Sequence, residues 1–301
     1  MKKLRFPSLP VMAGMLALLT APVPAGEAVK ATLINTSEAV FGRPHDLALT
    51  PPGLYLAVAD VDNNAIKILD PGKLRVVAEV GAGELSAPHD VTFQGEDRML
   101  VADSGNDRIV VYKFSSVYRD GSTNAERLAI WSDGLDSPEG VVAGRKGRIY
   151  VANTGDDTVV ALEDGKIVAT AGSAGGKEFE RPHDVDVDAN DRVIATDPGN
   201  NRLIVFDRDL KVLQEVGGDA YGFNEPKYIT TAEDGMLVVA DEYNNRIVLL
   251  DIDFNPVGMI GTGKRGDGPG EVYRPEGAEV AGKYLWIADT HNHRIQLYKR
   301  W

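Results

Sequence analysis

The residues in this chain most suited to chemistry are histidines that directly follow a proline. Three of the five histidines share this position: His45, His89 and His183. Neutral imidazole is the commonest nitrogen ligand for zinc, and three such ligands leave a coordination position open for water or a substrate. These histidines therefore indicate a metal or small-ligand site, provided that the fold brings them together.

The prolines belong to a repeat that predicts the fold. They are Pro44, Pro88, Pro138, Pro182, Pro226 and Pro275, with spacings of 44, 50, 44, 44 and 49 residues. Each is followed by an apolar strand, a turn, a second strand that ends at Asp or Asn, and further strands. This period is typical of a β-propeller. We predict an all-β fold, a six-bladed β-propeller of four-stranded blades.

The residues that follow the six prolines form a set that we call the ring. Its members are His45, His89, Glu139, His183, Lys227 and Glu276. The inner strands of a propeller all start at one mouth of the central channel, so these residues are expected to meet there.

Two other residue types recur at fixed places in the repeat. An Asp or Asn ends each second strand: Asp60, Asp103, Asn153, Asp197, Asp241 and Asp289. We expect each to hold the next turn by accepting a hydrogen bond from the main-chain N–H two residues on. The third strand often begins at arginine, and we expect these arginines to brace neighbouring carboxylates: Arg108, Arg202, Arg246 and Arg294.

The sixth repeat stops after its third strand, while a strand-like segment, Val29–Asn35, stands alone near the N-terminus. We predict that this segment supplies the outer strand of the last blade. Closure of this kind joins the termini and hides an edge that would otherwise favour aggregation.

The segment Asp289–Tyr298 (DTHNHRIQLY) resembles the motif that names the NHL-repeat family, and variants of it occur at Asp103–Ile109 and Asp241–Ile247. The resemblance covers nearly the whole mature chain and implies a six-bladed propeller. It implies little about activity, because this fold carries enzymes, binding platforms and scaffolds. His291 and His293 lie within this motif, and we assign them to the repeat rather than to a metal site.

The Pro-His-Asp triplets at 44–46, 88–90 and 182–184 also resemble the zinc-binding motif of the peptidylglycine α-amidating lyase propeller. That lyase takes its histidines from alternating blades, whereas these come from the first, second and fourth, with Glu139 at the remaining alternating position. The lyase has disulfides, and this chain has no cysteine. Neither a catalytic tyrosine nor a catalytic arginine is identified from the sequence, so its activity is not the leading interpretation.

Two interpretations of the ring stay open. In one, His45, His89 and His183, with Glu139 as a further candidate ligand, bind zinc or another divalent metal. In the other, the ring is a polar channel mouth where the histidines bond to Asp46, Asp90, Asp184 or water and Lys227 pairs with Glu276.

The leading functional hypothesis is recognition of a small molecule or partner protein at the channel mouth. One alternative is a metal-dependent lyase or hydrolase that uses the same ring, and another is a structural scaffold of the cell envelope. The sequence leaves open whether the protein is an enzyme.

The net charge and the N-terminal segment indicate which partners the protein has and where it is located. The 301-residue chain carries a net charge of −13, which disfavours nucleic acids as partners. Residues 1–25 read as a signal peptide, with Lys2, Lys3 and Arg5 before a short apolar run and a cleavage site before Gly26. Residues 26–301 would then form the propeller, periplasmic or secreted from a bacterium, with no stable membrane anchor after cleavage.

Overall fold

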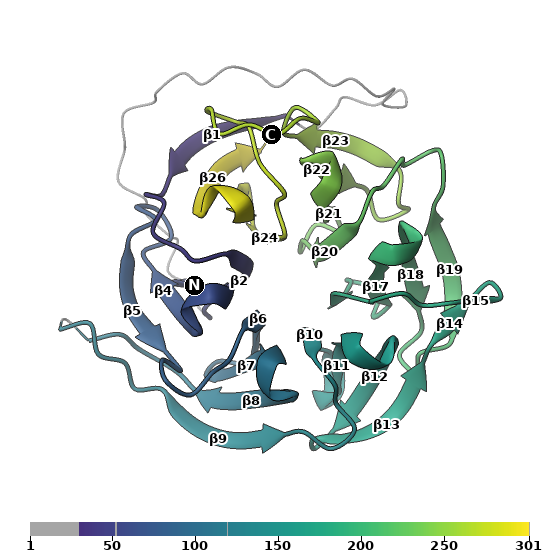
Figure 1. The fold of residues 1–301 in the computed structure, drawn as a ribbon, viewed down its shortest axis with the longest axis horizontal. Coiled ribbons are helices and arrows are strands. Elements are labelled where there is room, and N and C mark those ends of the chain that lie inside the picture. Colours follow the sequence, from purple (N-terminus) through teal and green to yellow (C-terminus); the bar gives the residue numbers. More distant parts are fainter. Residues whose placement is uncertain (1–29, 52, 119, 301) are drawn as a thin grey trace.

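The computed structural model describes residues 30–51, 53–118 and 120–300. It confirms the predicted six-bladed propeller: six four-stranded antiparallel sheets surround a common axis (Figure 1). The predicted signal peptide lies outside the described residues. Among the helices in the described part of the chain, none has the length and apolar character needed to cross a bilayer.

The blades follow one another along the chain, each running from an inner to an outer strand. Blade 1 contains β2 (Pro44–Leu49), β3 (Leu56–Asp60), β4 (Ala65–Leu69) and β5 (Val76–Val80). Blade 2 contains β6 (Pro88–Gln94), β7 (Arg98–Asp103), β8 (Arg108–Lys113) and β9 (Glu126–Trp131). Blade 3 contains β10 (Pro138–Ala143), β11 (Ile149–Asn153), β12 (Thr158–Glu163) and β13 (Lys166–Ala171).

Blade 4 contains β16 (Val185–Val187), β17 (Val193–Asp197), β18 (Arg202–Phe206) and β19 (Val212–Gly217). Blade 5 contains β20 (Pro226–Thr231), β21 (Leu237–Asp241), β22 (Arg246–Leu250) and β23 (Pro256–Ile260). Blade 6 contains β24 (Gly277–Ala281), β25 (Tyr284–Asp289), β26 (Arg294–Arg300) and β1 (Ala31–Thr36).

Short elements complete the fold. A two-stranded hairpin is formed by β14 (Ser173–Ala174) and β15 (Lys177–Glu178). The 3-10 turns are η1 (Val61–Asn63), η2 (Ser104–Asn106), η3 (Arg145–Gly147), η4 (Thr154–Asp156), η5 (Pro198–Asn200), η6 (Glu242–Asn244) and η7 (Thr290–Asn292).

The core lies between neighbouring blades rather than at the axis. The second strands, such as β3 and β21, are buried along their whole length because both of their faces pack against another blade. Outer strands such as β9 are largely exposed and read as mixed polar and apolar sequence. At the junction of blades 6 and 1, buried Trp286 donates an indole hydrogen bond to the carbonyl oxygen of Pro71 at 2.7 Å.

A buried hydrogen bond fixes the loop that precedes each inner strand. The Asp or Asn that ends the second strand accepts it from a main-chain N–H three residues before the ring residue, at 2.6–2.8 Å. The six donor–acceptor pairs are Gly42–Asp60, Ser86–Asp103, Asp136–Asn153, Glu180–Asp197, Asn224–Asp241 and Tyr273–Asp289. The architectural role predicted for these residues is therefore right, but the predicted donor two residues on is wrong.

The repeat arginines brace these carboxylates as predicted. Arg108 Nε donates to Asp103 at 2.6 Å, and the same bond recurs in blades 4, 5 and 6. A carboxylate at such a site is fully enclosed, as Asp103 is, and the paired guanidinium supplies both charge and hydrogen bonds.

A second repeated contact joins each blade to the next. The residue between each 3-10 turn and the third strand has a left-handed backbone conformation. In five blades its side chain accepts a hydrogen bond from the N–H of the residue before the next proline. Asn64, for example, accepts this bond from Ala87 at 2.8 Å. In the sixth blade His293 has this conformation, and its Nδ1 lies 2.9 Å from the carbonyl oxygen of Gly42 in the first. The role of His293 in the repeat is thus architectural.

The termini close the ring as predicted. Strand β1 pairs antiparallel with β26, with Ala31 opposite Arg300 and Leu33 opposite Tyr298. The side chains of Ala31 and Leu33 also pack against a core cluster between blades 5 and 6.

Inner-strand carboxylates join the blades below the mouth. Asp184 accepts a hydrogen bond from Ile229 N at 2.8 Å, and Glu279 accepts one from Leu49 N at 3.3 Å. They line a polar cavity of about 150 Å³ together with Asp46, Asp90 and Asp186. Burial raises the pKa of Asp186 to about 7 and that of Glu279 to about 8.

The closing strand gives a first prediction. A chain that starts at Glu38 lacks β1 and exposes β26 as an apolar edge. We expect it to aggregate or to melt roughly 10 °C or more below the mature protein, a loss of about 3–5 kcal/mol. Scanning calorimetry beside a chain that starts at Gly26 measures this. Unchanged melting of a monomeric Glu38 chain would contradict the closure.

Glu279 gives a prediction about pH. Its raised pKa means that the folded state binds more protons than the unfolded state between about pH 4.3 and 8, so its contribution to stability falls as pH rises through this window. Glu279→Gln removes that loss. Its effect on the free energy of unfolding should be on the order of 1 kcal/mol more favourable at pH 8 than at pH 5.

Urea unfolding at both pH values measures the difference. Glu126→Gln, on the exposed strand β9, is the matched control and should show no such difference. If the Glu279→Gln and Glu126→Gln proteins show the same pH dependence, Glu279 is not a buried proton-binding group.

Candidate functional site

The ring residues are aimed at the axis by an unusual backbone turn. Five of the six residues that precede the prolines have positive φ, between 44° and 55°: Ala87, Ser137, Arg181, Glu225 and Arg274. Residues other than glycine adopt this conformation at a cost, and the hydrogen bonds to their N–H groups offset it. This backbone conformation therefore recurs just before the ring residue in five of the six blades.

The three ring histidines converge in the channel. The centroids of His45 and His89 lie 4.7 Å apart, those of His89 and His183 6.0 Å, and those of His45 and His183 6.3 Å. The structure thus brings together the residues predicted as metal ligands.

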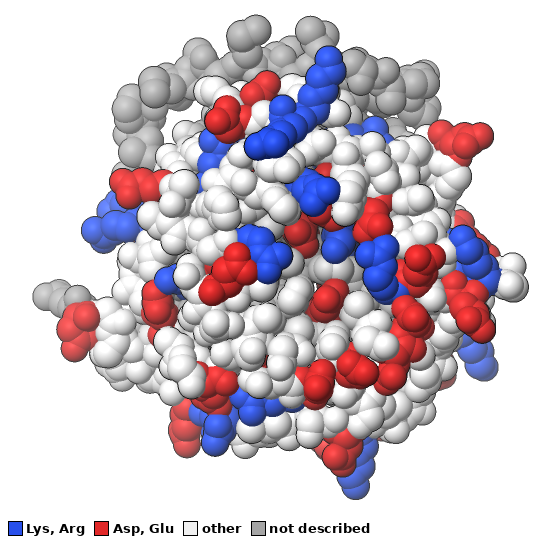
Figure 2. Space-filling model, in the orientation of Figure 1, with Lys and Arg blue, Asp and Glu red and all other residues white. Residues whose placement is uncertain are grey.

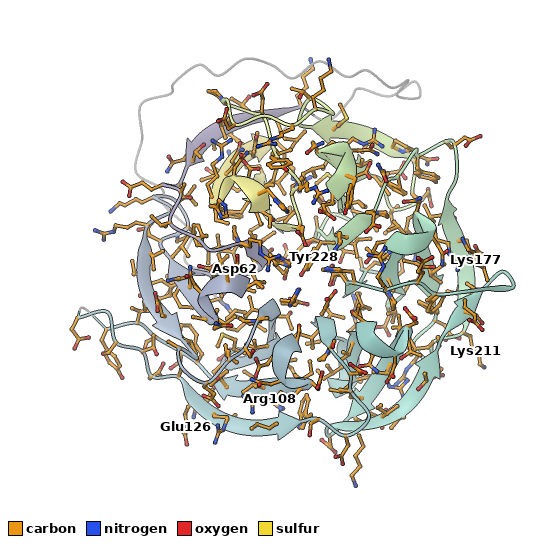
Figure 3. The ribbon with its side chains drawn as sticks, viewed as in Figure 1. Asp62, Arg108, Glu126, Lys177, Lys211 and Tyr228 are labelled. Carbon is orange, nitrogen blue, oxygen red and sulfur yellow. The ribbon has the colours of Figure 1, made fainter. Side chains whose placement is uncertain are left out.

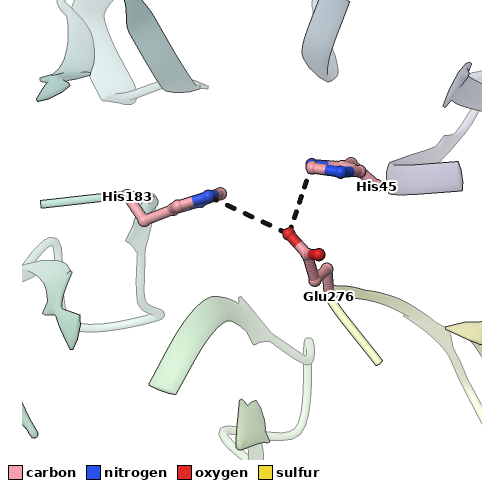
Figure 4. A group of neighbouring side chains, drawn as sticks. All are labelled: His45, His183 and Glu276. Carbon is pink, nitrogen blue, oxygen red and sulfur yellow. Dashed lines mark ion pairs between the residues drawn. The ribbon is translucent and has the colours of Figure 1, made fainter. Parts of the chain in front are cut away.

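One compact group of candidate ligands contains a carboxylate in place of the third imidazole. His45, His183 and Glu276 each offer one ligand atom, and these atoms all lie within 4.8 Å of one another (Figure 4). Glu276 Oε2 lies 3.3 Å from His45 Nδ1 and 4.0 Å from His183 Nε2. The sequence predicts Glu276 as a member of the ring but not as a metal ligand.

This group, which we call the axial centre, is buried and incompletely bonded. Its three residues are only 3–4% exposed. Both ring nitrogens of His45, Nδ1 of His183 and Oε2 of Glu276 are buried without a hydrogen-bond partner among the described residues. Buried polar atoms are seldom left unpaired, so these atoms point to a missing ligand or ion.

The charge states of the axial centre fit the same interpretation. Burial lowers the pKa of both His45 and His183 well below the usual range, which leaves neutral imidazoles with free lone pairs. Burial also raises the pKa of Glu276 to about 8. A bound cation would compensate the buried carboxylate and pair with the imidazole lone pairs.

His89 and Glu139 lie beside the axial centre and nearer the solvent. His89 Nδ1 donates to the carbonyl oxygen of Ala87 at 2.9 Å, which leaves Nε2 as the nitrogen with a lone pair. Glu139 places one oxygen 3.7 Å from His89 Nε2 and the other 3.0 Å from His183 Nε2. The Glu139 side chain is 19% exposed, so it can reach a molecule in the channel mouth.

The sequence-based picture of a merely polar mouth is wrong in its pairings. Lys227 Nζ lies 3.8 Å from Glu242, and not against Glu276. The histidines face Glu139 and Glu276, while the Asp residues that follow them line the lower cavity.

Tyr228 forms the floor between the mouth and the lower cavity. It is buried, and its hydroxyl donates across the axis to the carbonyl oxygen of His89 at 2.9 Å. Its ring centroid lies 4.9 Å from that of His183, and Figure 3 shows it near the centre of the molecule. The sequence held a signal, since the other blades have Asp or Gly at this position.

A second group adjoins the axial centre. One nitrogen of His291 and the carboxylates of Glu242 and Glu276 lie within 4.8 Å of one another. Sequence reasoning missed Glu242 and set His291 aside. The signal for Glu242 is its charge, because the residue after the repeat Asp or Asn is uncharged in every other blade.

Clefts elsewhere offer less chemistry. One of about 600 Å³ lies between β5 and the segment after β1, where Lys67, Lys73, Arg75 and Glu38 are the only charged lining residues. The channel mouth therefore remains the candidate site.

Comparison with known proteins identifies a fold and no family. No protein-family model matches the chain, and no curated protein sequence does. A solved streptogramin B lyase is 15% identical over 91% of this chain and 98% of its own, with a TM-score of 0.60. Virginiamycin B lyase from Staphylococcus aureus is 14% identical over 90% of this chain and 99% of its own, with a TM-score of 0.57.

A protein of unknown function from Bacteroides caccae is 11% identical over 72% of this chain and 85% of its own, with a TM-score of 0.54. The virginiamycin B lyase has also been solved with quinupristin, as a catalytically inactive histidine-to-alanine variant. At these identities the likeness supports the propeller fold alone, and the NHL-repeat resemblance stays a sequence-based prediction.

Proposed function

We propose that this propeller is a metal-dependent lyase that binds a small molecule at the channel mouth. The observation that carries the proposal is the axial centre, where two neutral imidazoles and a buried carboxylate converge and where His45 and Glu276 Oε2 lack hydrogen-bond partners among the described residues. Nitrogen and oxygen donors in this combination suit zinc and other first-row divalent ions. The lyase names of the structural neighbours are consistent with it, although their likeness extends only to the fold.

The residues divide into holding and reacting groups. His45, His183 and Glu276 would hold the ion, and His89 would offer a further nitrogen at the edge. A bound divalent ion supplies Lewis-acid polarisation of a carbonyl, hydroxyl or ester oxygen. Elimination also needs a base, and Glu139 is the carboxylate that reaches the mouth while it contacts His89 and His183.

Solvent access is one-sided in this arrangement. Tyr228 closes the channel below the imidazoles through its bond to the carbonyl oxygen of His89. A small molecule therefore enters from the mouth and meets Glu139 before it reaches the buried axial centre. Exclusion of water from below strengthens the electrostatic interactions within the centre.

Metal content is the test of this proposal. Protein purified without chelator should carry close to one equivalent of a transition metal, and chelation should lower its melting temperature by mass action. His45→Ala and His183→Ala should each weaken metal binding by more than about 100-fold, because even changes outside the ligand shell cost 10–100-fold.

The matched control is His293→Asn. Asn occupies this left-handed position in three other blades, and His293 contacts a carbonyl oxygen away from the axial centre. This variant should keep the metal. A wild-type protein that binds no transition metal, even after dialysis against zinc, would leave the mouth as a site of recognition without metal chemistry.

We also propose that the protein is exported by cleavage of residues 1–25. The charged, apolar and small-residue segments at the N-terminus support this. Expression of the precursor in a Gram-negative host should yield a periplasmic protein whose intact mass begins at Gly26. A mass that retains residues 1–25 in the membrane fraction would instead indicate an uncleaved anchor.

A further inference from the structure

The cations at the channel mouth are of two kinds. Arg43 and Arg181 are committed: Arg43 donates to Asp62 at 2.7–2.9 Å, and Arg181 donates to Glu225 at 2.8 Å. Lys227 and Arg274 differ, because neither side chain donates a hydrogen bond to any described residue.

Lys227 and Arg274 share one distant partner. Glu242 lies 3.8 Å from Lys227 Nζ and 3.8 Å from Arg274 Nε. Burial has removed Glu242 from water, and its Oε2 is one of the atoms without a hydrogen bond. A carboxylate oxygen of Glu242 lies within 4.8 Å of one of Glu276, so the two cations stand near two carboxylates without donating a hydrogen bond to either.

Both cations are placed next to the axial centre. Lys227 is a ring residue at the start of β20, and the next residue, Tyr228, packs its ring 4.9 Å from that of His183. Arg274 stands two residues before Glu276, and its guanidinium lies 4.2 Å from the ring centroid of Tyr243. That stacking holds the guanidinium plane in one orientation.

These side chains remain open to a ligand. They are 19% and 32% exposed, and together an ammonium and a guanidinium offer eight N–H donors. Figure 2 shows charged side chains of both signs around the central opening. Among these charges, Lys227 and Arg274 are a cationic pair whose N–H donors make no hydrogen bond within the described part of the chain.

We infer that Lys227 and Arg274 form an anion subsite and that the substrate of the channel mouth is a small carboxylate. The location beside a metal rests on the proposed function, whereas the anion subsite itself does not. A planar carboxylate matches the guanidinium fork.

Calorimetric titration with malonate tests the inference, with neutral malonamide and inorganic phosphate as comparison probes. Malonate should bind at low ionic strength, and malonamide should not. Lys227→Gln and Arg274→Gln should each weaken malonate binding on the order of tenfold, since each removes a charged hydrogen-bond donor at a partly exposed site.

Lys211→Gln and Arg127→Gln are the matched controls. Both side chains lie on outer strands or loops far from the axis, and Figure 3 labels Lys211 at the rim. They remove the same charges from the chain and should leave malonate binding unchanged. Melting curves of all four variants establish that each is folded.

The titration is repeated after removal of metal with chelator, because malonate can itself coordinate a metal. The loss in Lys227→Gln and Arg274→Gln should persist there. Equal malonate binding by these variants and wild type, equal binding of malonamide, or tighter binding of phosphate would each overturn the carboxylate subsite. If the protein binds metal but malonate binding does not depend on Lys227 and Arg274, the anion subsite is wrong and the proposed function still stands. If malonate binding depends on these residues but the protein binds no metal, the anion subsite stands and the proposed function is wrong.

Discussion

One buried hydrogen bond, repeated in every blade, fixes the geometry on which the candidate site depends. It runs from a main-chain N–H to the Asp or Asn at the end of the second strand, as from Glu180 to Asp197 at 2.8 Å. The donor always lies three residues before a ring residue. Loss of such an acceptor would remove a hydrogen bond that contributes about 0.5–1.5 kcal/mol to stability and would release the loop that precedes the ring residue.

Because this hydrogen bond recurs in all six blades, the repeat itself brings the ring residues together, and no further element is needed to position them. Each blade contributes one side chain to the mouth, and the residue type alone decides what the mouth can bind. The chain uses this freedom unevenly. The neutral, unpartnered groups of the axial centre occupy one part of the ring, and the cations Lys227 and Arg274 stand next to it. A ligand that is both metal-binding and anionic would satisfy both parts.

The fold was predictable because the same sequence pattern occurs six times along the chain. The repeated prolines and turn residues predict blade number and strand order, the unpaired segment Val29–Asn35 predicts the closure, and the structure agrees with each. The partners of the repeat Asp were not predictable, since they are donors 16–18 residues earlier that only tertiary structure brings near. The histidines were found from their shared position, which is also a property of the repeat.

The rest of the site depends on single departures from the repeat. Glu242 and Tyr228 each occur where the other blades have a different residue type, so a search for what recurs passes over them. Arg274 shares its position with Arg43 and Arg181 and differs from them only in its partners. Their importance follows from the direction and burial of one side chain. Glu276 joins His45 and His183 rather than Lys227 for the same reason.

The measurement that tests the central claim most directly is X-ray absorption at the metal edge of the mature protein purified without chelator. The account predicts a bound first-row metal whose nearest shell contains nitrogen and oxygen, with the outer-shell scattering of at least two imidazoles. A shell of oxygen alone, or one without imidazole scattering, would show that the axial centre does not hold the metal.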